Sequence, residues 1–221
     1  MKLSKGQLKN IIELSLLYEA GIVPSSLMDM MLQPMKLRVL DFDDTIAHTG
    51  EEVKLYTQDG YRMLSSDEYA TYVPKAGEYY DDTSFDQFSR VDIEKAKPVE
   101  SVYRILMNFV NANEGNRRIL ILTARKQIVE NDVRSFLESI NIDHSAIDFV
   151  GVGSSDPFEK VRIISEYIEN YNISFVSFFD DSIKNVSAVK EYLDSIEMEN
   201  DVAHIKDDDG RIRLIRNFKI K

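Results

Sequence analysis

The chain has 221 residues, a formal net charge of −11 and no cysteine, which excludes a disulfide framework and thiol chemistry. Its length suits one domain with an insertion, and it can bury a sizeable core without covalent cross-links. The acidic charge argues against general nucleic-acid binding, because phosphate contacts need Lys and Arg. No apolar run approaches the length of a membrane span, and the N-terminus lacks a signal-peptide pattern, so we expect a cytoplasmic protein.

Two short helices are predicted before the first strand. Residues 4–19 show the apolar spacing of an amphipathic helix that begins at Ser4. A second, methionine-rich helix is predicted over 25–32 and is expected to pack against the main domain. Pro34 then breaks the segment, so residues 1–34 are predicted to form an N-terminal helical extension.

From residue 35 onward, short apolar runs alternate with amphipathic segments. Strands are predicted at 37–42, 118–122, 148–150, 175–179 and 202–205. Helices are predicted at 98–112, 127–139, 157–171 and 183–196. Strands and helices that alternate with short links predict a parallel sheet with helices on both faces. The runs at 118–122 and 175–179 lack polar alternation, as strands buried on both faces do.

Residues 47–96 interrupt this alternation directly after the first strand. Two β-prone runs flank Gln58-Asp59-Gly60, a pattern that predicts a β-hairpin. Several aromatic residues belong to the same segment: Tyr56, Tyr61, Tyr72, Tyr79, Tyr80, Phe85 and Phe88. We expect them to form the insertion's own core, with the alternative that some contact a ligand.

Carboxylates follow directly after two of the predicted strands. The first strand leads into DFDDT, in which the period-two alternation puts Asp41 and Asp43 on the same face. The run at 175–179 ends in Asp180 and Asp181. Ligands of open parallel sheets bind outside the carboxyl ends of the strands. Neighbouring carboxylates repel one another, and a hard cation such as Mg²⁺ would compensate their charge.

Four motifs occur in order along the chain: LDFDDT, ILTAR, a lysine at position 160, and FFDDS. Together they resemble the four motifs of the haloacid dehalogenase (HAD) superfamily of phosphotransferases, over roughly residues 37–206. The resemblance implies a HAD-like (Rossmannoid) α/β fold with a small cap inserted after the first core strand. The predicted division is a HAD core at 35–46 and 97–206, a cap at 47–96, and a basic C-terminal tail or edge strand at 207–221.

The resemblance also implies roles for the residues of the first motif. Asp41 would be the nucleophile that forms an aspartyl phosphate, and Asp43 would be the general acid and base. HAD dehalogenases lack this second aspartate, so Asp43 favours phosphate over halide chemistry. For Thr45, we expect a hydroxyl bond to the backbone that stabilises the turn.

The second and third motifs would bind the phosphate. Thr123 would contribute its hydroxyl, and the backbone at Ala124 and Arg125 would lie close to the phosphate oxygens. The Arg125 side chain has two open interpretations, because it could bind the substrate or pair with surface acids. Lys160 would hold the nucleophile and the phosphate charge, with Lys184 as the competing lysine.

The resemblance implies a magnesium site made from Asp41, Asp43, Asp180 and Asp181. Asp180 would be the more direct ligand, and Asp181 would bind directly or through water. Asn185 would orient these carboxylates by hydrogen bonding. The alternative for Asp181 and the serine after it is N-capping of the next helix.

The predicted function is Mg²⁺-dependent hydrolysis of a small phosphate monoester through an aspartyl phosphate. One alternative is a polynucleotide 3′-phosphatase, which the acidic charge opposes and the basic C-terminal residues favour. Another is a HAD-fold binding protein without turnover. The layout also resembles uncharacterised HAD-like proteins of tailed phages, which would place the protein in the host cytoplasm. The expected partner is a small phosphorylated substrate, with no membrane association.

Overall fold

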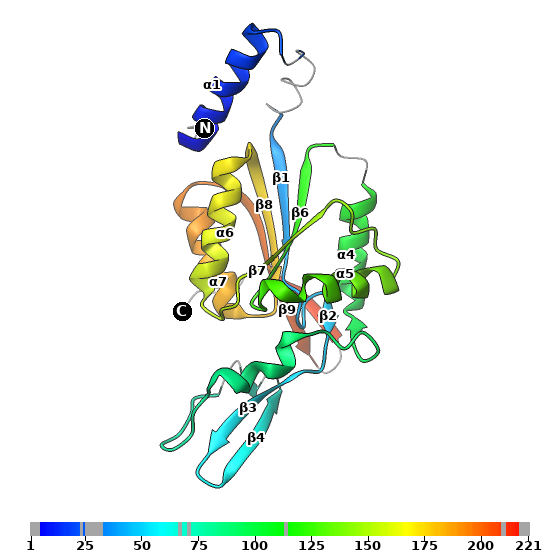
Figure 1. Ribbon diagram of the computed structural model, residues 1–221, viewed down its shortest axis with the longest axis vertical. Coiled ribbons are helices and arrows are strands. Elements are labelled where there is room, and N and C mark those ends of the chain that lie inside the picture. The colour runs from blue at the N-terminus through cyan, green and yellow to red at the C-terminus, as the bar shows by residue number, and fades with distance from the viewer. Residues whose placement is uncertain are drawn as a thin grey trace.

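The computed structural model describes residues 5–22, 24, 33–65, 68–69, 72–112, 115–208 and 211–216. A six-stranded sheet forms the centre of the molecule, in the order β10-β9-β8-β1-β6-β7 (Figure 1). Its strands are β1 (Met35–Leu40), β6 (Arg117–Thr123), β7 (Ile147–Gly151), β8 (Ile173–Asp180), β9 (Glu199–Asp208) and β10 (Arg211–Ile215). Neighbouring strands are parallel, except that β10 pairs antiparallel with β9 at the edge. The predicted α/β fold with a parallel sheet is confirmed.

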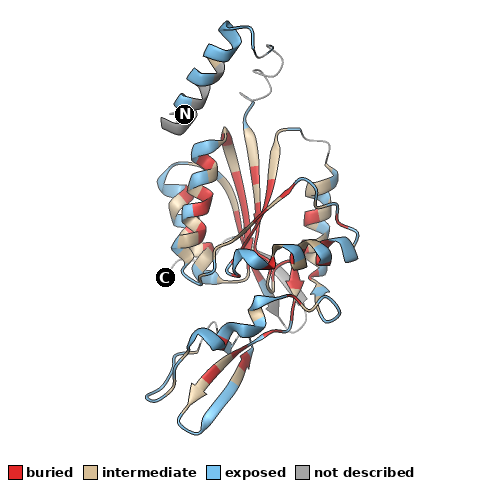
Figure 2. Ribbon diagram, viewed as in Figure 1, coloured by how far each residue is buried: buried red, intermediate tan, exposed pale blue. Residues whose placement is uncertain are grey.

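Two layers of helices cover the two faces of the sheet (Figure 1). On one face lie α4 (Glu100–Asn111) and α5 (Glu130–Ser139). The short 3₁₀ helix η2 (Gln127–Val129) directly precedes α5. On the other lie α6 (Pro157–Asn170) and α7 (Ile183–Ser195). In β6, Ile119 and Ile121 pack toward α4 and α5, whereas Leu120 and Leu122 pack toward α6 and α7. The strand therefore has two apolar faces, which explains why its sequence lacks polar alternation. Figure 2 shows this burial along the central strands.

The insertion emerges from the carboxyl end of the sheet (Figure 1). Its neck consists of β2 (Ala47–His48) and β5 (Lys97–Pro98), which pair antiparallel. Beyond the neck, β3 (Glu52–Thr57) and β4 (Gly60–Ser65) form the predicted hairpin, and η1 (Asp82–Ser89) leads back toward the core. The hairpin turn uses Gly60, whose φ of 138° is rarely accessible to other residues.

Aromatic side chains of the insertion pack mainly against one another. Tyr56 stacks on Tyr79 with ring centroids 5.4 Å apart. Tyr69 makes edge contacts with Tyr80 and Phe85 at 5.3 and 5.5 Å. The aromatic residues therefore contact one another as expected, but they do not form a buried core, because Tyr79 is 54% exposed and Phe85 37%. The buried side chains of the hairpin are aliphatic: Val53, Leu55 and Leu64.

Two helix starts differ from the sequence-based expectation. Pro98 does not open a helix; it pairs with Ala47 in the neck, and the Val99 amide donates to the Ile46 carbonyl at 2.9 Å. Because residues 98 and 99 are held in this pairing, α4 begins at Glu100. The other helix, predicted to begin at residue 127, opens with the 3₁₀ turn η2.

At the N-terminus, α1 (Lys5–Glu19) contacts α6 and leaves large apolar side chains exposed, including Ile12 at 57% and Leu16 at 59%. The predicted N-cap Ser4 and the predicted helix at 25–32 lie outside the described residues. Within the described part of the chain, no helix combines the length and apolarity needed to cross a membrane.

Candidate active site

The carboxyl ends of β1 and β8 bring three aspartates together. Asp41 follows β1 directly, Asp180 is the last residue of β8, and Asp181 follows it. The strands are parallel neighbours, and the Asp41 amide donates to the Phe179 carbonyl at 2.9 Å. One carboxylate oxygen from each aspartate lies within 4.8 Å of the others. The sheet register thus converts two separate sequence motifs into one cluster.

A tight turn holds Asp41 at this edge. The amides of Ile46 and Ala47 both donate to the Phe42 carbonyl, at 2.9 and 3.0 Å. Asp44 adopts a positive φ of 51°, a conformation that Asp tolerates better than most residues. The ring of Phe42 is fully buried, so the turn is anchored in the core below.

Lys160 enters the cluster from the first turns of α6. The Asp156 side chain caps this helix by accepting from the Phe158 amide at 3.0 Å, and Pro157 occupies the first helical turn. The Lys160 ammonium lies 2.6 Å from Asp41 Oδ1 and 2.6 Å from Asp180 Oδ2, with 2% of its side chain exposed. It therefore lies where the sequence predicted.

The competing lysine behaves differently. Lys184 is exposed near the start of α7. An exposed position suits a strongly hydrated ammonium group but gives no buried ion pair. Of the two lysines, Lys160 is the one that contacts the carboxylates.

The electrostatics of the cluster favour an additional cation. Burial raises the pKa of Asp41 to about 8; the Lys160 ammonium opposes this shift and the Asp180 carboxylate adds to it. Burial also raises the pKa of Asp181, helped by Asp180 and Asp41. Although burial disfavours the charged ammonium, Asp180 and Asp41 raise the pKa of Lys160, so it stays protonated. The raised pKa values favour the protonated forms of Asp41 and Asp181, and a divalent cation would displace these protons by binding the ionised carboxylates.

The three aspartates fit a magnesium ion by chemistry and by size. Mg²⁺ prefers oxygen ligands at about 2.1 Å, so ligands on opposite sides of the ion lie about 4.2 Å apart. The 4.8 Å span of the cluster needs little adjustment to meet that value. Asp41, Asp180 and Asp181 are thus the candidate ligands.

Hydrogen bonds orient the second acidic pair. Asp180 is fully buried and accepts from the Ser182 amide at 2.8 Å and from Asn185 Nδ2 at 3.0 and 3.1 Å. Asn185 therefore contacts the carboxylate that it was expected to orient. Ser182 occupies the N-cap position of α7, as the capping alternative predicted, but its side chain makes no cap hydrogen bond.

Thr45 also differs from expectation. Its hydroxyl donates to Asp181 Oδ1 at 3.3 Å and is fully buried, whereas the sequence suggested a bond to the backbone. The turn places Thr45 beside the carboxyl end of β8, where the Asp181 carboxylate accepts this hydrogen bond. The backbone of the turn is satisfied by its own amide–carbonyl bonds.

Asp43 lies beside this cluster but takes no part in it. Its carboxylate forms a bidentate pair with Arg125, with Nε–Oδ2 at 2.8 Å and Nη2–Oδ1 at 2.7 Å. The Thr49 hydroxyl also donates to Asp43 Oδ1 at 2.9 Å. The sequence predicted this carboxylate as a metal ligand, whereas in the structure its two oxygens are committed to Arg125 and Thr49. Bidentate pairing fixes the orientation of this carboxylate.

Arg125 pairs with acidic residues, as one of the two interpretations of its side chain predicted, and the other interpretation, substrate binding, stays a prediction. It is 3% exposed, and its acidic partners are inside the protein, not on the surface. Besides Asp43, it pairs with Glu51 in the insertion at 2.9 Å. It also donates to the carbonyls of Arg90 at 2.6 Å and Phe88 at 3.3 Å. Arg125 thus links the β1 turn to both sides of the insertion, and Glu51 is a site residue that sequence reasoning missed.

The loop after β6 depends on a glycine in the neighbouring strand. A Cβ on Gly151 would lie 2.7 Å from three backbone atoms of residues 125–127, too close for any side chain. In the loop, the buried Thr123 hydroxyl accepts from the Arg125 amide at 3.2 Å, and Ala124 is exposed. Thr123 and Ala124 therefore lie at the same edge of the sheet as the aspartates.

Comparisons with known proteins add one structural similarity. No family model matches the sequence, and no curated protein matches it. Among solved structures, the chain is similar to the HAD domain of the effector protein Lem4 from Legionella pneumophila, with a TM-score of 0.43 and 19% identity. The match covers 76% of this chain and 85% of that one. The resemblance to phage proteins finds no support in these comparisons.

Proposed function

We propose that the protein is a Mg²⁺-dependent phosphomonoester hydrolase that works through an aspartyl phosphate. The observation that carries the proposal is the buried contact of Lys160 with both Asp41 and Asp180, beside a second, separately held carboxylate at Asp43. A buried ion cluster is costly to maintain unless it serves a bound group. Here it combines an ordered nucleophile, an acid–base candidate and a cation site.

In the proposed reaction, a carboxylate oxygen of Asp41 attacks the phosphorus and the bond between phosphorus and the ester oxygen breaks. Asp43 donates a proton to the departing oxygen, which leaves as an alcohol. To carry that proton, Asp43 gives up one of its two hydrogen bonds from Arg125. Asp43, now ionised, takes a proton from water while the water oxygen attacks the aspartyl phosphate. Inorganic phosphate leaves, and Asp41 and protonated Asp43 are regenerated.

The remaining residues position the groups and balance charge. Lys160 holds Asp41 in place and keeps a positive charge beside the transferred phosphoryl group. Asp41, Asp180 and Asp181 would hold Mg²⁺, which when bound neutralises phosphate charge. Arg125 orients Asp43 through its bidentate contact. We propose Thr123 as a phosphate-binding hydroxyl at the end of β6.

The direct test is magnesium-dependent release of p-nitrophenol from p-nitrophenyl phosphate by the purified full-length chain. EDTA should abolish turnover and Mg²⁺ should restore it. Asp41→Asn should lower kcat by about 10³-fold or more while the protein stays folded, since the amide cannot attack phosphorus. The matched control is Asp143→Asn, an exposed aspartate in the loop between α5 and β7, which should leave kcat unchanged. Turnover of Asp41→Asn within tenfold of wild type would exclude the covalent mechanism.

A further inference from the structure

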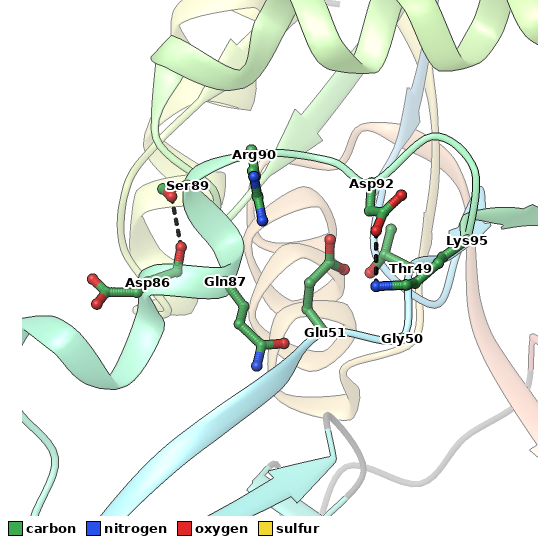
Figure 3. Close-up of a pocket in the computed structure, with 9 residues that line it drawn as sticks. All are labelled: Thr49, Gly50, Glu51, Asp86, Gln87, Ser89, Arg90, Asp92 and Lys95. Carbon is green, nitrogen blue, oxygen red and sulfur yellow. Dashed lines mark hydrogen bonds and ion pairs between the residues drawn. The ribbon is translucent and has the colours of Figure 1, made fainter.

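A cleft of about 570 Å³ lies at the base of the insertion (Figure 3). Two segments line it, residues 49–51 at the start of the hairpin and residues 86–95 on the return path to the core. Apart from a glycine, each described lining residue has a polar or charged side chain, and none is aromatic. Ligand pockets are usually lined mainly by apolar and aromatic side chains. This cleft therefore suits a ligand that carries several hydrogen-bonding groups.

The cleft adjoins the acid–base candidate. Thr49, which lines it, donates to Asp43 at 2.9 Å. Glu51, which also lines it, lies 2.9 Å from Arg125, and Arg125 holds Asp43. A group bound here would be one side chain away from the carboxylate that protonates the leaving oxygen. The position is that expected for the leaving group and not for the phosphate.

Glu51 is the most constrained charge in the cleft. Its side chain is only 8% exposed, and its Oε2 atom makes an ion pair with Arg125 without hydrogen-bond geometry. Figure 3 shows its carboxylate directed into the space between Arg90 and Asp92. The ion pair with Arg125 holds Oε2 inside the protein, so the other oxygen of this carboxylate would accept a hydrogen bond from a donor on a bound ligand.

The neighbouring side chains select the kind of donor. Asp92 and Lys95 form an ion pair with each other at 2.9 Å, and Glu51 pairs with Arg125. The remaining hydrogen-bonding capacity is of two kinds, because ionised Glu51 and Asp92 can only accept, whereas Arg90 and Lys95 can only donate. A hydroxyl group both donates and accepts, so several hydroxyls can satisfy both kinds of partner. An ammonium group would satisfy only the carboxylates, and a second anionic group only the cations.

We propose that this cleft binds the leaving group of a polyhydroxylated phosphate ester, with Glu51 as a specificity-determining residue. The proposal rests on the proposed function for its account of the reaction. The cleft itself can be tested separately, because binding does not require turnover.

The deciding measurement is calorimetric titration of the full-length Asp41→Asn protein in Mg²⁺. The probes are glucose 6-phosphate, mannose 6-phosphate, fructose 6-phosphate and glycerol 3-phosphate, with hexyl phosphate as the ester without extra hydroxyls. At least one polyol ester should bind about tenfold more tightly than hexyl phosphate. Adding Glu51→Gln or Arg90→Gln should reduce this preference several-fold, whereas Asp59→Asn at the exposed hairpin turn should not change it.

Several results would overturn the proposal. Hexyl phosphate could bind as tightly as every polyol ester, or the preference could survive both Glu51→Gln and Arg90→Gln. The second variant guards against a Glu51→Gln protein that fails to fold, because the Arg90 side chain is not the part that Arg125 contacts. If wild type does not hydrolyse p-nitrophenyl phosphate but the polyol preference persists and depends on Glu51, the hydrolase assignment fails and the cleft assignment stands.

Discussion

Replacing Lys160 with methionine would remove the ammonium that lies 2.6 Å from both Asp41 and Asp180. Methionine keeps the length and apolar character of the lysine stem, so the substitution removes charge and leaves volume nearly unchanged. The two carboxylates would stay buried, with Asp41 6% exposed and Asp180 fully inaccessible. The variant therefore isolates the electrostatic role of Lys160 in folding.

The size of the effect follows from the burial of this pair. Removing one partner of a buried ion pair costs about 3–5 kcal/mol, because the remaining charge is uncompensated. Part of this cost is absent at neutral pH, because Asp41, whose pKa burial raises to about 8, is already largely protonated. We therefore expect the lower end, about 3 kcal/mol at neutral pH. For a protein of this size, that loss lowers Tm by about 6–12 °C.

Urea unfolding followed by circular dichroism measures this loss directly. The first series contains EDTA, so that only the protein's own charges contribute. The matched control is Lys184→Met, which removes an exposed lysine and should change the unfolding free energy by no more than about 0.5 kcal/mol. In a second series, Mg²⁺ should stabilise Lys160→Met more than wild type, because three carboxylates would then lack any cationic neighbour.

A Lys160→Met protein whose unfolding free energy in EDTA lies within 1 kcal/mol of both wild type and Lys184→Met would contradict the predicted loss. That result would mean that Lys160 does not hold the buried carboxylates in solution. An equal response of both lysine variants to Mg²⁺ would likewise remove the electrostatic basis of the cation site.

Three further predictions concern the same region. In EDTA, the unfolding free energy of wild type relative to that of Asp41→Asn should fall as pH rises from about 4 to 8. The reason is that the pKa of the Asp41 carboxyl is about 8 in the folded state and 3.8 in the unfolded state, so the folded state holds an extra proton in this range. A difference between the two proteins in urea titrations that stays flat or rises with pH would contradict this. Arg125→Lys should slow hydrolysis of phenyl phosphate about tenfold more than hydrolysis of p-nitrophenyl phosphate. Phenol is the poorer leaving group, so its departure depends more on protonation by a correctly oriented Asp43. Equal losses of activity on both substrates in steady-state kinetics would count against Arg125 as the residue that orients Asp43. Gly151→Ala should cost about 1–3 kcal/mol, because its Cβ would lie 2.7 Å from the backbone of residues 125–127; a thermal melt within 1 °C of wild type would disprove the close approach.

The sequence by itself determined the sheet and the position of the carboxylate cluster. Apolar runs without polar alternation identified the buried strands, and the aspartates directly after two of them had to meet at one edge of a parallel sheet. Asp41, Asp180 and Asp181 accordingly lie together. Lys160 was predictable only through its place in an ordered set of motifs, because a lysine at a helix start is ordinarily solvated.

Only the tertiary structure decided how the charged side chains of Asp43, Arg125 and Glu51 are arranged. Asp43 and Arg125 are 82 positions apart, and Arg125 reaches Glu51 in the insertion as well. No local pattern specifies these partners, because periodicity gives the face on which a side chain lies but not the distant group that it meets. The position of Asp43 at the end of the first strand grouped it with the metal ligands. In the structure its carboxylate instead pairs with the Arg125 guanidinium, which follows the neighbouring strand. The cleft beside Glu51 arises in the same way, from two segments of the insertion that only the folded chain brings together.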